Sequence, residues 1–283
     1  MISQCGSLAS SQAPHSAILC KLSSEEKERI AMTKYKAITP ILNRMQEVYA
    51  KNMLSFVRRL GQNIRNGQEP AGLLLKRELV KSLIEIKRPG SYQAATIGYR
   101  WGELLVSQVN KEEEELDGEL IAAIEDRLEY MSEKESETFL EKVALIILAL
   151  LSIRVLRNEG GSATRALTAL EIADRFIKDM AKFVANYAGV VASAMTVWAE
   201  NEGTQHAFIR AGVEANEWVA VADDRTCPFC MDMDGTIVAS GAAFLGPLEE
   251  LNVGGKVLRG FDLPTIHPPV HPRCRCTLIP VTI

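Results

Sequence analysis

Four cysteines and one histidine near the C-terminal end of the chain have the spacing of metal ligands. Cys227 and Cys230 form a Cys-Pro-x-Cys pair, and a second group reads His271-Pro-x-Cys274-x-Cys276. A Cys-x-x-Cys turn offers two thiolates to one tetrahedral ion, and residues two apart in a strand face the same side. We therefore expect four of these five side chains to hold a structural Zn²⁺. Buried free thiols and disulfides are the alternatives that the spacing leaves open.

Three other motifs in this segment match the signatures of known functional sites only in part. Cys-Pro-x-Cys is typical of redox-active dithiols where it opens a helix of a βαβ unit, but a turn-like Met-Asp-Met-Asp-Gly follows here. Asp232-x-Asp234-Gly-Thr matches the nucleophile string of haloacid-dehalogenase-type phosphatases, but only 49 residues follow Asp234, too few for their large sheet. The same string resembles the start of an EF-hand loop, but Ala243 stands at the twelfth position, where a glutamate is needed.

A catalytic zinc site would need an open coordination position and a general base. Glu249 and Glu250 lie in the long loop between the two ligand groups, with no fixed spacing to the cysteines. His267 is expected to be either a spare ligand or an exposed loop residue between prolines. We therefore expect no enzyme, and a zinc-dependent hydrolase is the alternative.

The remaining cysteines and the composition define the setting. Cys5 and Cys20 lie far from the cluster, and six cysteines in 283 residues are too few for a disulfide scaffold. The N-terminus lacks a basic stretch followed by an apolar one, so we expect no signal peptide and a reducing compartment. The most apolar run, residues 143–151, is about half the ~20 residues of a spanning helix, so we expect no membrane association.

Charge is distributed unevenly along a chain of low net charge. The chain carries 47% hydrophobic and 24% charged residues and a net charge of −4, as a globular protein does. Residues 44–88 hold 10 Lys/Arg against 4 Asp/Glu, whereas residues 112–141 hold 2 against 13. Residues 221–283 hold 5 Lys/Arg against 7 Asp/Glu, so we expect no direct nucleic-acid binding. The two blocks indicate either solvated faces or a surface that docks a partner.

The apolar pattern divides the chain into four consecutive segments. Residues 1–22 are expected to form a flexible tail, residues 23–160 a helical domain, residues 161–212 a helical connector and residues 213–283 the Cys/His module. The expected fold is a mainly α N-terminal body followed by a small, loop-rich α+β C-terminal module with short strands and a zinc site.

Local signals predict where elements begin and end. Ser23 and Glu26 form a capping box at one helix start, and Thr39-Pro40 indicates another. Another helix should stop before Pro89, and Gly212 should terminate the last long one. Helices are expected over 40–66, 71–86, 92–109, 116–156, 166–203 and 205–211, a hinge at Gly160-Gly161, and strands at 218–222, 237–238 and 277–281.

The C-terminal motif resembles a known family. The residues that carry the resemblance are Trp218, Asp223-Asp224-Arg225-Thr226-Cys227-Pro-x-Cys230, Asp234-Gly235 and His271-Pro-x-Cys274-Arg275-Cys276. They are similar to the C-terminal module of phage Mu protein F-like minor head, or head-morphogenesis, proteins, over about residues 165–283. An Arg-Thr-Glu signature usual in the preceding helix of that family is replaced here by Ser-Ala-Met-Thr at 193–196.

The resemblance implies a minor capsid protein of a tailed phage. Such proteins are virion components of low copy number that associate with the portal vertex and assist procapsid assembly or the packaging and delivery of DNA. The implied partners are the portal protein and, beyond it, the major capsid or scaffolding protein. The implied locations are the capsid interior or portal vertex of the virion, and the host cytoplasm during assembly. Because Mu F-like modules are sometimes joined to toxin domains, a toxin-like effector is a further alternative.

Overall fold

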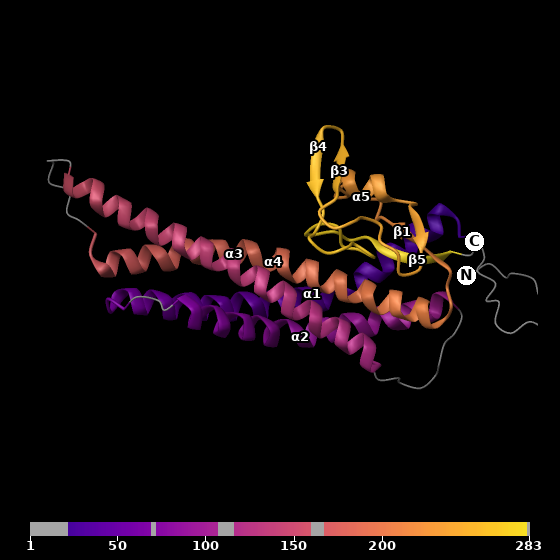
Figure 1. Cartoon of the computed structure of the whole chain (residues 1–283), viewed down its shortest axis with the longest axis horizontal. Coiled ribbons are helices and arrows are strands. Elements are labelled where there is room, and N and C mark those ends of the chain that lie inside the picture. The colour runs from indigo at the N-terminus through magenta and orange to yellow at the C-terminus, as the bar shows by residue number, and fades with distance from the viewer. Residues whose placement is uncertain (1–21, 69–71, 107–115, 160–166, 282–283) are drawn as a thin grey trace, which may run out of the picture. The chain divides into compact units, whose positions relative to one another are not determined.

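The computed structural model describes residues 22–68, 72–106, 116–159 and 167–281 and is mainly helical. Four long helices are followed by one short helix and five strands (Figure 1). The long helices are α1 (Ser24–Arg65), α2 (Gly72–Leu105), α3 (Gly118–Glu159) and α4 (Ala169–Arg210). The expectation of a mainly α chain with a small strand-containing C-terminal part is confirmed. The expected tail, apart from Leu22, and the expected hinge lie outside the described residues.

Capping signals fix the helix ends. The Ser23 hydroxyl accepts a hydrogen bond from the Glu26 N–H at 3.2 Å, and the Glu26 carboxylate accepts one from the Ser23 N–H at 2.9 Å, which confirms the capping box. Thr168 and Glu171 make the same reciprocal bonds at the start of α4. α4 ends just before Gly212, whose φ of 71° is the left-handed conformation typical of a helix terminus.

Two prolines lie inside helices, so the breaks predicted at Pro40 and before Pro89 are wrong. A proline in a helix interior costs about 3 kcal/mol, because it removes a hydrogen bond and crowds the preceding turn. Ile38 and Leu42, on either side of Pro40, are both buried, and buried residues likewise continue on both sides of Pro89. Each buried aliphatic side chain contributes about 1.5–3 kcal/mol, so packing outweighs the local cost.

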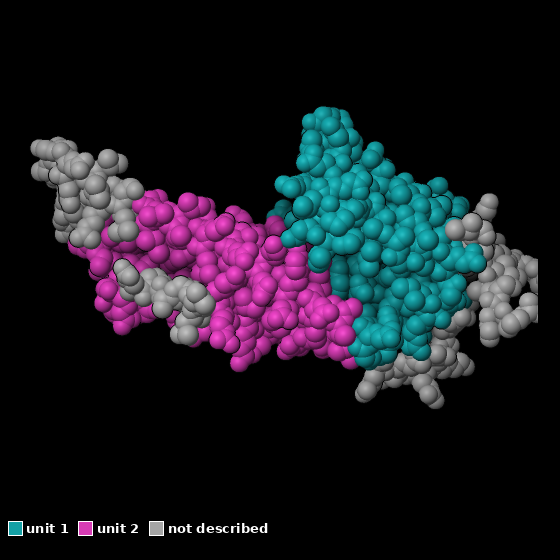
Figure 2. All heavy atoms as spheres, viewed as in Figure 1, with its two compact units in different colours: residues 1–39, 94–120, 197–283 teal, residues 40–93, 121–196 magenta. Residues whose placement is uncertain are grey.

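The chain forms two compact units, each built from separated segments (Figure 2). Unit 1 contains Met1–Thr39, Ala94–Leu120 and Val197–Ile283, and unit 2 contains Pro40–Gln93 and Ile121–Thr196. Each long helix therefore contributes residues to both units. The Cys/His segment shares unit 1 with the start of α1 and the end of α2.

Unit 2 is an up-and-down four-helix bundle. α1 runs antiparallel to α4, and α2 antiparallel to α3, because early residues of one helix contact late residues of the other. Phe56 of α1 and Phe139 of α3 meet edge to face across the centre, with ring centroids 5.9 Å apart. α1 and α3 thus occupy opposite corners. The contacts that give this arrangement are Arg65–Asp174 and Gln46–Gly189 for α1–α4, Lys76–Glu137 and Arg88–Glu125 for α2–α3, Met45–Gly90 for α1–α2, and Phe139–Phe183 for α3–α4.

A buried ion pair lies in the core of unit 2. Lys87 Nζ of α2 lies 3.1 Å from Glu135 Oε1 of α3, and the two side chains are 0% and 4% exposed. Burial lowers the pKa of Lys87 and raises that of Glu135, and each partner opposes the shift of the other. Such a pair adds little net stability, but separating its members inside the core is costly. It therefore favours one alignment of α2 against α3.

The core of unit 1 contains a three-stranded antiparallel sheet of order β2-β1-β5. Its strands are β1 (Ala215–Val219), β2 (Ile237–Ala239) and β5 (Thr277–Val281). β2 and β5 confirm the strands predicted at 237–238 and 277–281, whereas β1 begins and ends three residues before the strand predicted at 218–222. Asn201 of α4 binds the outer edge of β5: its amide donates to the Cys276 carbonyl at 3.2 Å, and its carbonyl accepts from the Leu278 N–H at 3.1 Å. The side chain thus covers an edge that would otherwise be open to pairing.

A hairpin that the sequence reading missed lies in the long loop. It consists of β3 (Glu250–Val253) and β4 (Lys256–Arg259), paired in antiparallel register. Gly254 and Gly255 form its two-residue turn with φ values of 58° and 77°. Positive φ at both central positions is the requirement of a type I′ turn, which glycine meets at low cost.

α2 and α4 approach each other very closely in unit 1. A Cβ at Gly98 would lie 1.7 Å from the Glu200 carbonyl oxygen, and a Cβ at Gly203 would lie 2.1 Å from the Ala95 carbonyl oxygen. Thr204 uses this proximity, because its hydroxyl donates to the Gly98 carbonyl at 3.0 Å. The prediction of a helix break after Gly203 is therefore wrong, because this glycine serves helix contact within α4.

A second buried ion pair lies beside this crossing. Lys34 Nζ of α1 lies 2.8 Å from Glu200 Oε1 and donates to the Thr204 hydroxyl at 2.9 Å. The two charged side chains are 1% and 2% exposed. Burial lowers the pKa of Lys34, and the carboxylate opposes that shift.

One described helix, α4, is long and apolar enough to cross a membrane by length and composition alone. Of its most apolar stretch, 56% is buried inside the structure, as is usual for a core helix. A single helix of this kind is weak evidence for a membrane span.

Candidate metal centre

The first two candidate ligands are held by a short helix, α5 (Pro228–Met233). Cys227 is the N-cap residue, and its Sγ accepts a hydrogen bond from the Cys230 N–H at 3.4 Å. Pro228 occupies the first helical turn, where its missing N–H breaks no helical hydrogen bond. The turn brings both sulfurs to one side, and Cys230 is buried.

The second group lies on the segment that leads into β5. The Cys274 N–H donates to the His271 carbonyl at 3.2 Å, which closes a tight turn between these two ligands. Cys274 and Cys276 are both buried, and Cys276 immediately precedes the first residue of β5. The alignment of β5 therefore determines where this group meets the first.

The structure brings all five candidate side chains into one cluster. His271 Nε2 lies 2.9 Å from Cys227 Sγ and 3.1 Å from Cys230 Sγ, and Cys230 Sγ lies 3.8 Å from Cys274 Sγ. The ligand atoms form two trios, Cys227–Cys230–His271 and Cys230–Cys274–Cys276. Within each trio every pair lies within 4.8 Å, and Cys230 belongs to both.

The donor set fits a tetrahedral ion that prefers sulfur and imidazole. Two sulfurs bound to Zn²⁺ at about 2.3 Å lie about 3.8 Å apart on a tetrahedron. The Cys230–Cys274 separation of 3.8 Å matches this spacing. His271 Nδ1 lies 2.6 Å from the Pro272 carbonyl oxygen, so Nδ1 carries the ring proton and the Nε2 lone pair faces the sulfurs. The sulfur–nitrogen distances are shorter than those around an ion, so the fit rests on donor type and sulfur spacing.

The three buried thiols share hydrogen bonds, which separates their pKa values. Hydrogen bonds to Cys274 and Cys276, and then burial, raise the pKa of Cys230. Burial raises the pKa of Cys274, but hydrogen bonds from the other two thiols outweigh burial and lower this pKa well below its usual range. The hydrogen bond with Cys230 lowers the pKa of Cys276. The bond with Cys274 and burial outweigh this effect, so the pKa of Cys276 is raised.

An ion pair beside the cluster fastens the two ligand segments together. The Arg275 guanidinium donates through two nitrogens to the Asp223 carboxylate, and it stacks over the Tyr35 ring at 5.7 Å. Asp223 also accepts from the Arg225 N–H at 2.9 Å. The Arg275 bonds hold the pKa of Asp223 well below its usual range. The loop before Cys227 is thereby joined to the residue between the last two cysteines.

His267 belongs to neither trio and has partners of its own. His267 is only 3% exposed. Its Nε2 lies 2.6 Å from a Glu202 carboxylate oxygen, and its Nδ1 lies 2.6 Å from the Pro268 carbonyl oxygen. Both expectations for it, a spare ligand and an exposed loop residue, are wrong. Asp234 accepts a hydrogen bond from the Ala220 N–H at 2.7 Å, which gives this residue of the phosphatase-like string a structural contact.

Glu249, which the sequence places in the long loop between the two ligand groups, does not enter the described cluster. Glu249 is exposed and accepts a hydrogen bond from the Gly246 N–H at 2.7 Å, so it fixes its own turn. Cys5 and Cys20 lie outside the described residues.

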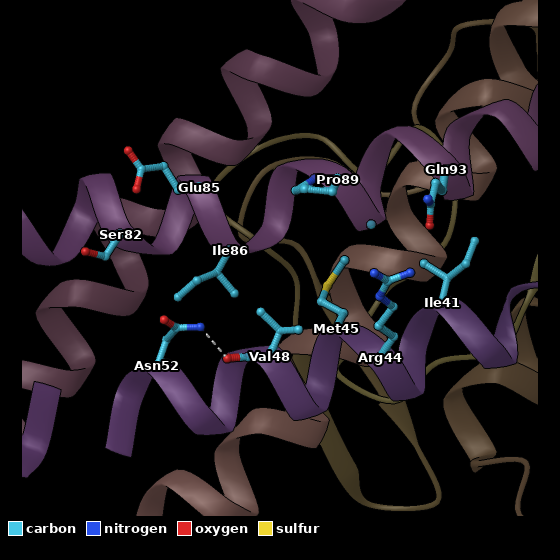
Figure 3. Close-up of a pocket in the computed structure, with 11 residues that line it drawn as sticks. Ile41, Arg44, Met45, Val48, Asn52, Ser82, Glu85, Ile86, Pro89 and Gln93 are labelled. Atoms are coloured by element: carbon cyan, nitrogen blue, oxygen red, sulfur yellow. Dashed lines mark hydrogen bonds between the residues drawn. The ribbon is translucent and has the colours of Figure 1, made fainter. Parts of the chain in front are cut away.

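A separate hollow of about 400 Å³ lies in unit 2 between α1 and α2 (Figure 3). Its apolar wall includes Met45, Val48 and Ile86, and Arg44 stands at its α1 side. Among the described residues that line it there is neither a cysteine nor a histidine. Among the described residues, the groups of three or more side chains that could hold a metal ion lie in unit 1.

A family model matches the C-terminal part of the chain. Residues 158–279 match the family model described as phage Mu protein F like protein. No curated protein and no solved structure matches the chain. The matched range contains α4 and every ligand of the cluster. The C-terminal part of the chain is therefore similar to phage Mu protein F over 122 of its 283 residues.

Proposed function

We propose that this Mu F-like chain is a minor head protein of a tailed phage. It associates with the portal vertex and assists procapsid assembly or the packaging and delivery of DNA. The observation that supports this role is the family match over residues 158–279. The proposed partners are the portal protein and the major capsid or scaffolding protein, and the proposed location is the virion.

We further propose that four of the five clustered side chains bind one Zn²⁺. The ion would join α5 to the segment before β5, in addition to the Asp223–Arg275 ion pair that already links the two ligand segments. His271 would donate its Nε2, oriented by the Nδ1–Pro272 contact, and cysteine thiolates would supply the other positions. Bound zinc supplies folding energy by cross-linking segments that a small loop-rich region cannot hold together alone.

A structural role suits the donor set better than a catalytic one. A catalytic zinc site keeps one position open for water or substrate, whereas a structural site is closed by four protein ligands. This cluster offers five protein donors for four positions, and three of them, Cys230, Cys274 and Cys276, are buried. We therefore propose a metal that shapes the surface of unit 1, with no step of a reaction assigned to it.

Metal analysis of the purified full chain tests the centre. We expect about one Zn²⁺ per chain, and loss of most of it in Cys227→Ser and His271→Ala. Met231→Ser is the matched control, because this exposed side chain lies in the same short helix and outside both trios. A wild-type chain without metal, or one whose thiols are joined in disulfides, would overturn the zinc proposal.

Co-expression with the portal protein of the same genome tests the assembly role. We expect the chain to co-purify with portal rings and to be present in isolated procapsids. Its absence from both procapsids and virions would refute the role even if zinc were found. Because the metal and the partner are measured separately, each proposal can fail without the other.

A further inference from the structure

The bundle of unit 2 carries oppositely charged stripes on two of its helices. On α1, Arg44, Lys51 and Arg58 are exposed and follow one another at seven-residue steps. Seven residues are nearly two helical turns, about 10.5 Å, so the three cations lie along one face, which also carries the exposed Glu47 between Arg44 and Lys51. We call them the basic stripe. None of the three has an ion-pair partner among the described residues.

An acidic stripe runs along α3. Asp126 and Glu133 are seven residues apart, Glu129 and Glu141 flank them on the same side, and all four are exposed. These carboxylates also have no ion-pair partner among the residues that the structure describes. Two other acidic residues of α3, Glu125 and Glu137, are already paired with α2 and are excluded from the stripe.

The internal ion pairs show that part of the charge asymmetry of the sequence is satisfied within the bundle. Lys76, Lys87 and Arg88 of α2 pair with acidic residues of α3. The outer faces of α1 and α3 retain the remainder, with opposite signs. Because these helices occupy opposite corners of the bundle, their outer faces point in opposite directions and cannot neutralise each other within one chain.

We propose that the acidic stripe of one copy of this chain docks on the basic stripe of a second copy. The charges are complementary, and Asp126 and Glu133 share the seven-residue step of the basic stripe, so these two carboxylates can meet two successive cations. Apolar surface accompanies both stripes: Val48, on the basic side, is 38% exposed beside the hollow of Figure 3, and Leu145, just beyond the acidic stripe, is 62% exposed.

Such an interface is head-to-tail. Each copy uses one face to bind one neighbour and leaves the opposite face for another, so the contact generates a ring or an open chain of copies rather than a closed pair. Screening by salt weakens contacts between exposed charges, so the association should be strongest at low ionic strength.

Sedimentation velocity of the full chain tests the interface. We expect species larger than a monomer at about 0.05 M salt and monomers at about 0.5 M, where the Debye length has fallen about threefold. Asp126→Lys with Glu133→Lys, and separately Arg44→Glu with Lys51→Glu, should each weaken self-association at least about tenfold, because attraction is replaced by repulsion. Helix content measured by circular dichroism verifies that both variants fold.

A mixture of the two charge-reversed variants is the decisive test of the interface. The two charge-reversed variants should not self-associate alone but should associate with each other, because each then offers the charge that the other lacks. The matched control is Lys178→Glu with Lys182→Glu, a reversal of two exposed cations on α4, which should associate as the wild type does. A wild type that is monomeric at low salt, or a mixture that stays monomeric, would overturn the proposal.

Discussion

Replacing Gly203 by alanine should destabilise unit 1 although alanine is the better helix former. The added Cβ would lie 2.1 Å from the Ala95 carbonyl oxygen and 2.9 Å from the Tyr99 backbone nitrogen. Both are main-chain atoms of α2, so no side-chain rotation relieves the contact. The helices must separate by about 1 Å to restore an ordinary van der Waals distance. That movement also stretches the Thr204–Gly98 hydrogen bond, now 3.0 Å.

The magnitude follows from opposing effects. Overpacking costs about 1–3 kcal/mol and a weakened buried hydrogen bond about 1 kcal/mol, while the helix propensity of alanine returns about 1 kcal/mol. The net loss of about 1–3 kcal/mol corresponds to a fall in melting temperature of roughly 3–10 °C. Gly189→Ala is the matched control in the same helix, because its Cβ would lie 3.5 Å from the nearest atom, a flexible Gln46 side chain.

Thermal unfolding of the two variants, followed by circular dichroism and calorimetry, measures the difference. The control should melt at or slightly above the wild-type temperature, and Gly203→Ala clearly below it. If Gly203→Ala melts no lower than the control, the close approach of α2 and α4 in unit 1 is not a feature of the folded protein.

Three further outcomes are expected. Lys34→Met should lower the free energy of unfolding, measured with denaturant, by about 3–5 kcal/mol, because it leaves Glu200 buried without its partner. The double variant Lys34→Met with Glu200→Leu should recover most of that loss. Equal losses in the two variants would contradict the buried pair. The Arg88 hydrogen bonds lower the pKa of Glu125, so the pair stabilises the fold above the ordinary carboxyl value of 4.5 and loses this contribution as pH falls through the lowered pKa. Arg88→Ala should therefore cost about 0.5–1 kcal/mol at neutral pH and nothing in strong acid, and a cost independent of pH would contradict this sign. Incubation with a chelator should lower the melting temperature and added Zn²⁺ should restore it, whereas an unchanged melting curve would count against a structural ion.

Helical periodicity predicts the core of unit 2 well, because it is a local property. The apolar residues of α1 at three- and four-residue steps are buried along one face: Leu42, Met45, Tyr49, Met53, Phe56 and Leu60. The same reading ended one helix before Pro89 and began one at Pro40, because proline chemistry is local and the packing that overrides it is not. Lys34 shows the limit most plainly, since nothing near it in the sequence indicates a partner at Glu200.

The members of each ligand group can be predicted from the sequence because they are close together in it, whereas the partners of the buried ion pairs are far apart. The Cys-x-x-Cys and His-x-x-Cys-x-Cys spacings are short, so each specifies which side chains converge within its own group. The shared donor chemistry predicts that the two groups meet, although Cys230 and His271 are 41 residues apart. His267 depends instead on Glu202, 65 residues earlier, and neither residue type signals a buried pair. The sequence does not predict the β3–β4 hairpin, because its strands have four residues each, too few for a period of two to stand out.

The interleaving of the two units has a consequence for synthesis on the ribosome. Unit 1 joins the first described residues of the chain to its last strand, so Lys34 emerges 166 residues before Glu200. At roughly 5–20 residues per second, the N-terminal part of α1 waits about ten seconds or more for its partners. Unit 2 needs nothing beyond Thr196 and can be complete before β5, which begins 81 residues later, is translated. The order of translation therefore favours folding of the bundle of unit 2 first. The Cys/His region packs against the start of α1, which completes unit 1, only after β5 leaves the ribosome.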